Sequence, residues 1–135
     1  GQIRRQRQMC IRDRLKINTE EDDLNKIFIN KITNLTYPDD IISSFNWETV
    51  LNNRENFKCK YGILIHKENQ LFESKAISNL DTKLMFMVEK EIFYSRNFEL
   101  PKERCVVWTV NDVDEIINIL NMDVYGVVTD IGDKL

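Results

Sequence analysis

The sequence contains few of the residues that usually mark a catalytic or binding motif. Its 135 residues include one histidine, three cysteines, four glycines and two prolines. The few glycines do not form a glycine-rich loop of the kind that cradles a phosphate. Three cysteines, widely spaced and odd in number, fit neither a disulfide framework nor a metal-ligand pattern. No run of about 18 apolar residues occurs, so we expect no transmembrane segment.

The length and composition favour one domain with a core of its own. Hydrophobic residues make up 42% of the chain, and a chain of this length is ordinarily a single domain. No apolar stretch typical of a signal peptide follows the basic N-terminus, and we expect a cytoplasmic protein. The chain lacks a basic surface rich in aromatic residues, so no nucleic-acid partner is expected.

The first 14 residues differ in composition from the rest of the chain. Residues 1–16 carry six Lys or Arg against one acid, and such an arm can bind nucleic acid. The stretch from Met9 to Arg14, however, is similar to the translation of a transposase-end sequencing adapter. We therefore interpret residues 1–14 as an adapter-derived, non-native segment and exclude them from the fold prediction. Residues 15–135 remain as the domain.

Strand-like and helix-like patterns alternate along that domain. The helix over 113–120 is typical, because apolar residues recur there at helical spacing and Asn111 or Asp112 precedes them as a cap. Strands alternating with helices of about ten residues indicate parallel βα units. Strands are predicted at 41–45, 60–66, 84–88, 105–110 and 125–129, and helices at 19–35, after Asn46, at 68–79 and at 113–120.

Two motifs near the C-terminus resemble a known enzyme family. The strand that carries Trp108-Thr109-Val110-Asn111 is followed, after the helix, by the segment G-V-V-T-D over 126–130. This pair is similar to the closing βαβ unit of glycerophosphodiester phosphodiesterases, which are phospholipase-C-like TIM barrels. The resemblance implies an α/β fold that is the C-terminal part of a (β/α)8 barrel. The barrel would be incomplete, since a whole one needs roughly 250 residues.

The same resemblance implies two substrate-binding residues. Trp108 matches the family tryptophan that lines the hydrophobic side of the glycerol pocket. The segment 41–46 resembles the family strand V-[IV]-x-S-F-D, so Phe45 matches the phenylalanine that walls the same pocket, with Asn46 in place of the usual aspartate. Without the resemblance, both aromatic side chains are ordinary core residues.

Lys16 is the candidate catalytic residue that the resemblance implies. The segment Leu15-Lys16-Ile17 lies at about the right distance before the S-F motif to match a family strand whose lysine contacts the phosphate. Arg14 then occupies the position of the glutamate that binds the metal in that strand. A solvated lysine is the alternative interpretation.

Most of the family's catalytic signature does not occur in this chain. There is no H-R-G, no E-x-D and no H-D motif, and His66 is the only histidine. In the family, carboxylates hold a divalent metal, Ca or Mg, and two histidines act as acid and base. We therefore expect this chain to bind no metal by itself and to be inactive alone. Glu89 and Glu91, spaced to point the same way at a strand end, could bind a cation or simply be solvated.

The sequence thus predicts the C-terminal portion of a glycerophosphodiester phosphodiesterase. The complete enzyme would hydrolyse a small-molecule glycerophosphodiester to glycerol 3-phosphate and an alcohol. Two alternatives stay open at this point: a non-catalytic α/β binding module, and another phospholipase-C-like barrel phosphodiesterase.

Overall fold

A computed structural model of the chain describes residues 2–3 and 40–131. The predicted helix at 19–35 and the candidate residue Lys16 lie outside these residues. Within them, strands and helices alternate, and every strand pairs in parallel with its neighbours. The predicted α/β class is therefore confirmed.

From residue 40 onward, the strands lie side by side in the order in which they occur along the chain. The sheet order is β1-β6-β5-β4-β3-β2, in which β1 is a two-residue strand at the edge beside β6. The strands are β1 (Gln2–Ile3), β2 (Ile41–Ser44), β3 (Lys60–Ile65), β4 (Met85–Glu89), β5 (Cys105–Trp108) and β6 (Gly126–Val127). Each of the five predicted strands is present, although several end one or more residues earlier than predicted.

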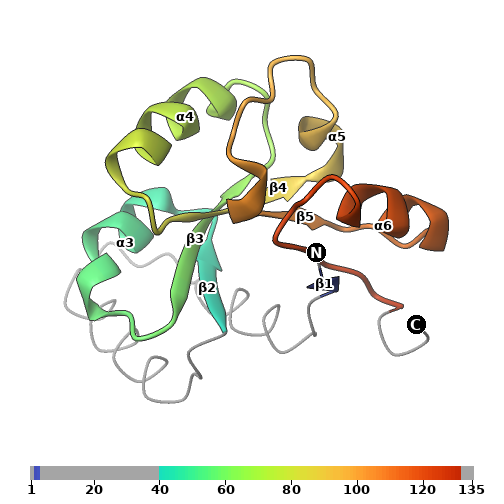
Figure 1. Cartoon of the computed structure of the whole chain (residues 1–135). Coiled ribbons are helices and arrows are strands. Elements are labelled where there is room, and N and C mark those ends of the chain that lie inside the picture. Colours follow the sequence, from blue (N-terminus) through green and yellow to red (C-terminus); the bar gives the residue numbers. More distant parts are fainter. Residues whose placement is uncertain (1, 4–39, 132–135) are drawn as a thin grey trace.

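Within residues 40–131, four α-helices follow the strands and gather on one side of the sheet. They are α3 (Trp47–Asn52), α4 (Gln70–Leu80), α5 (Lys90–Phe93) and α6 (Val113–Leu120), with short 3-10 turns at Arg54–Asn56 and Lys102–Arg104. In Figure 1 the helices form an arc above the strands. The caps predicted from sequence are present: the Asn46 side chain accepts from the Thr49 N–H, and that of Asp112 accepts from the Asp114 N–H.

The main core lies between the sheet and these helices. It joins the strand residues that face the helices to apolar residues of all four helices. We call this side of the sheet the helix-covered face. Its buried members include Ile63, Ile65, Phe86, Val88, Val107 and Val127 from the strands, and Val50, Leu71, Phe93, Ile116 and Ile119 from the helices.

A second buried cluster lies on the opposite face of the sheet. It consists of Ile41, Leu64, Met85, Met87, Val106 and Val128, with Trp108 and Tyr125 packed against it. No helix among the described residues contributes to it. Because side chains alternate along a strand, strands buried on both faces should read as continuous apolar runs, which is the pattern of β4 and β5.

One side-chain orientation expected from the predicted strand at 105–110 is wrong. Strict alternation puts Val110 on the same face as Val106 and Trp108, but Val110 belongs to the helix-covered core. The reason is that β5 ends at Trp108, so the alternation stops there, and the Val110 N–H instead donates to the Val128 carbonyl at 3.0 Å.

Candidate functional site

Several side chains that can carry chemistry come together at the carboxyl ends of the strands. Phe45 follows β2, His66 follows β3, Glu89 ends β4 and Trp108 ends β5. By strand alternation, all four side chains belong to the face opposite the helices. Glu89 and Trp108 are register partners of β4 and β5. This edge of a parallel sheet is where α/β proteins build their binding sites.

The aromatic rings at this edge contact one another. Phe45 packs edge-on against His66, with ring centroids 5.0 Å apart, and against Trp108, with centroids 6.2 Å apart and planes at 89°. Perpendicular packing is the favourable arrangement, since the positive edge of one ring meets the negative face of the other. Phe45 is 39% exposed, so an apolar surface remains open to a ligand. The structure thus brings the two predicted substrate-binding residues together.

Glu89 and Glu91 add an acidic group beside the rings. Burial raises the pKa of Glu89, and the hydrogen bond with Glu91 and the charge of Glu91 raise it further, while His66 acts in the opposite direction. A neighbouring negative charge favours the protonated form of Glu89. Glu91 lies in α5, not on the strand, so the two side chains meet because the chain turns into a helix directly after β4.

His66 is the residue of this edge that sequence reasoning undervalued. Its backbone N–H donates to the Gln70 side chain at 2.9 Å, which fixes the start of α4. Its Nδ1 atom is buried and has no hydrogen-bond partner among the described residues. Strand alternation from Leu64 was the available signal, because it puts His66 on the same face as Phe45 and Trp108.

The two C-terminal motifs are joined by hydrogen bonds. The Asn111 side-chain oxygen accepts from the Thr129 hydroxyl at 3.2 Å and from the Asp130 N–H at 3.0 Å. The asparagine of the W-T-V-N motif therefore holds the loop after β5 against the end of β6. This role is structural. It explains why both motifs end in polar residues without requiring a ligand.

Within 40–131, no three His, Cys, Asp or Glu side chains lie where they could hold a metal ion. Cys59 and Cys105 are buried, and burial raises the pKa of the Cys105 thiol well above its usual range. No helix in this part of the chain combines the length and apolar character required to cross a bilayer.

Comparisons with protein-family models, with curated proteins and with solved structures find no match for this chain. A function for this chain is therefore inferred from its own residues.

Proposed function

We propose that residues 15–135 are the C-terminal portion of a glycerophosphodiester phosphodiesterase whose complete form is a (β/α)8 barrel. The complete enzyme hydrolyses a glycerophosphodiester to glycerol 3-phosphate and an alcohol. In this proposal Phe45 and Trp108 form the apolar wall against the glycerol carbons, and Lys16 contacts the phosphate.

The strand order supports the barrel part of the proposal. Right-handed crossovers that always step to the next strand in the same direction put all helices on one face. A doubly wound sheet, in contrast, reverses its order and carries helices on both faces. The order β2 to β6 runs without reversal, and the described helices all pack on the helix-covered face. Such a sheet buries its second face most simply by closing into a barrel.

The approach of Phe45 and Trp108 is the observation that carries the proposal. Two strands, β3 and β4, lie between the strands that hold these residues. In a flat sheet their side chains would stand three strand spacings apart, or roughly 14 Å. The ring centroids are instead 6.2 Å apart, so the side chains converge over the face opposite the helices. Convergence over the concave face is expected where barrel strands end and a substrate pocket begins.

The chemistry of the proposed reaction needs groups that the described residues do not supply. The resemblance implies a divalent metal, Ca or Mg, in the complete enzyme, but no group of described residues fits a metal ion. No reaction step on a metal ion is therefore assigned to these residues. The part assigned to these residues is binding: two perpendicular aromatic rings exclude water from one side of the substrate and orient it.

Two other functions compete with this proposal. A non-catalytic α/β binding module could use the same aromatic edge, and the hydrogen bonds of Asn111 give the C-terminal motifs a structural explanation in either case. Another phospholipase-C-like barrel phosphodiesterase would share the fold and differ in substrate. The convergence of Phe45 and Trp108, which the resemblance assigns to one pocket, favours the glycerophosphodiester phosphodiesterase.

The upstream gene sequence is the most direct test. We expect it to encode H-R-G followed by E-x-D, and the protein encoded by the complete gene to hydrolyse glycerophosphocholine only with Ca or Mg present. The 135-residue chain alone should show no hydrolysis above background with either metal. Hydrolysis by the isolated chain, or an upstream sequence without these motifs, would contradict the proposal.

A further inference from the structure

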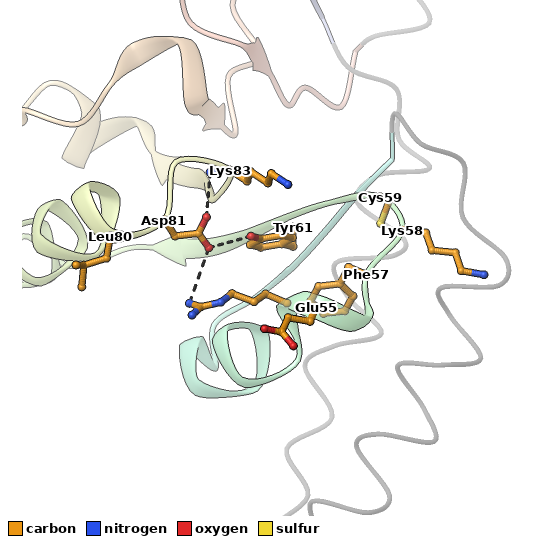
Figure 2. A pocket seen from close by; sticks show the side chains of 9 residues that line it. Glu55, Phe57, Lys58, Cys59, Tyr61, Leu80, Asp81 and Lys83 are labelled. Carbon is orange, nitrogen blue, oxygen red and sulfur yellow. Dashed lines mark hydrogen bonds and ion pairs between the residues drawn. The ribbon is translucent and has the colours of Figure 1, made fainter.

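A positively charged cleft lies at the amino edge of the sheet, at the opposite ends of the strands from Phe45 and Trp108. It is a cavity of about 460 Å³, formed where β3 begins and by the residues just before β4, β5 and β6. It adjoins a second cavity of about 520 Å³, shown in Figure 2, and the two share Lys58, Cys59, Tyr61 and Lys83. The charged residues that line the first cavity are Lys58, Lys60, Lys83, Glu103 and Arg104, and Tyr125 lies beside them.

Cations outnumber acids in this cleft. Among the described residues, three lysines and Arg104 line it, and Glu103 is the only acidic residue that does so, although the whole chain has a net charge of −3. None of the three lysines forms an ion pair within the described part of the chain. Lys60 lies over the Tyr125 ring, 5.8 Å from its centroid, a contact that stabilises a cation without neutralising it.

Arg104 also adds positive charge to this cleft. Its guanidinium donates to the carbonyl groups of Leu84, at 2.9 Å, of Ser78 and of Asp81. These acceptors are neutral, so they satisfy the donors and leave the positive charge uncompensated. The same contacts hold the end of α4 and the turn before β4 in place, which fixes the wall that carries Lys83.

Asp81, which lines the adjoining cavity, has hydrogen-bond partners of its own. Asp81 accepts from the Tyr61 hydroxyl at 2.8 Å and from the Lys83 backbone N–H at 2.9 Å, and it lies 3.9 Å from Arg54. Figure 2 shows the Lys83 side chain extending away from this carboxylate. Asp81 therefore positions the turn but leaves the Lys83 ammonium group without a carboxylate.

Two of the lysines line this cleft from neighbouring segments of the chain, Lys60 at the start of β3 and Lys83 in the turn before β4. Gly62 pairs with Met85 in the parallel ladder, and the residues two positions before each are Lys60 and Lys83. Two like charges at neighbouring strand starts repel each other, and the repulsion is relieved by an anion between them.

We propose that this amino-edge cleft binds an anion of the phosphate class through Lys58, Lys60 and Lys83. The ammonium groups that line this one cleft offer several donors, which suits an oxyanion with several acceptor oxygens and more than one negative charge. The same chemistry is presented by a soluble pyrophosphate and by the phosphate headgroup of an anionic lipid. The inference does not depend on the proposed function, since the cleft lies at the other edge of the sheet.

The test measures whether the 135-residue chain binds pyrophosphate in solution and whether it binds vesicles that contain phosphatidic acid. Pyrophosphate should raise the thermal midpoint above that in sodium chloride of equal ionic strength, because a ligand of the folded state stabilises it. The Lys60→Gln/Lys83→Gln variant should bind at least about tenfold more weakly, since one charge-assisted hydrogen bond contributes about that factor. Lys67→Gln, an exposed lysine at the other edge, is the matched control and should bind as the parent chain does.

The outcomes separate cleanly. Vesicle binding without a pyrophosphate response identifies a lipid headgroup as the source of the anion, and the reverse identifies a soluble ligand. Equal effects of pyrophosphate and chloride together with no vesicle binding would overturn the proposal, as would unchanged binding by the double variant. Should that variant fail to fold, the amide chemical shifts of the parent chain test the proposal instead. Pyrophosphate must then shift the amide resonances of residues 58–60, 83 and 104 selectively.

Discussion

The rings of Phe45 and Trp108 meet edge to face, with centroids 6.2 Å apart, although β3 and β4 separate the strands that carry them. His66 also packs against Phe45, with ring centroids 5.0 Å apart, so Phe45 contacts both other rings. Its exposed fraction of 39% is large for a side chain with two aromatic neighbours. An aromatic side chain that packs against two rings and stays partly exposed is suited to contact a ligand.

The aromatic wall can be tested in the complete enzyme that we propose. Trp108→Phe should lower kcat/KM by about tenfold, equivalent to about 1.4 kcal/mol of lost apolar contact in the transition state, and leave metal affinity unchanged because no ligand atom is removed. Phe57→Leu, at the amino edge, is the control and should keep full kcat/KM. If Trp108→Phe retains full activity on every glycerophosphodiester tried, Trp108 is a core residue only.

Local pattern was sufficient to predict most elements. The apolar stripe of 113–120 coincides with α6, and the continuous apolar run at 84–88 lies within one residue of β4. The short helix α5 was not predicted, because four residues are too few to display a helical period. The side of Val110 was assigned wrongly because alternation was extended past the end of β5.

The candidate site was only partly predictable from the sequence. Resemblance named Phe45 and Trp108, but it gave no reason to add His66 or Glu89. Their meeting depends on strand order and register, which determine that Glu89 lies opposite Trp108. These relationships arise from long-range pairing and leave no mark in the local sequence pattern.

Residues 1–14 should be dispensable for folding. Gln2 and Ile3 pair with Gly126 and Val127 at the sheet edge, but the few hydrogen bonds of a two-residue strand are offset by the entropy of ordering it. Deleting residues 1–14 should change the free energy of unfolding by less than about 1 kcal/mol, as measured by urea denaturation. A larger loss would identify β1 as a genuine element and remove the adapter interpretation.

Gly62 and Ser43 should respond oppositely to replacement by alanine. A Cβ atom at Gly62 would lie 2.9 Å from the Met85 carbonyl oxygen, so the β3–β4 pairing must shift, at a cost of about 1–3 kcal/mol. Its register partner Ser43 is fully buried, and its hydroxyl has no hydrogen-bond partner among the described residues. Ser43→Ala should therefore be neutral or stabilising. Urea denaturation of both variants measures this, and a costly Ser43→Ala would reveal an unseen partner of the hydroxyl.

Tyr61 should make the folded state sensitive to alkaline pH. Burial, followed by the hydrogen bond to Asp81 and the charge of Asp81, raises the pKa of Tyr61 to about 12, whereas an unfolded tyrosine titrates near pH 10. Because the folded state holds the proton more tightly, the stabilisation is complete below about pH 10 and is lost as the pH rises through about 12. Tyr94, whose pKa is also raised to about 12 by burial and Glu115, adds to the effect.

Asp81→Asn is the most informative variant for this titration, which is monitored by the ultraviolet absorbance of tyrosinate. It removes the negative charge but keeps a hydrogen-bond acceptor, so the pKa of Tyr61 should fall partway toward 10 while burial maintains the rest of the shift. Tyr61→Phe removes the group altogether and should remove its part of the late titration, while the part of Tyr94 remains. If Asp81→Asn leaves the late phase unchanged, the carboxylate does not face the hydroxyl in solution. The turn that carries Lys83 is then held by some other contact.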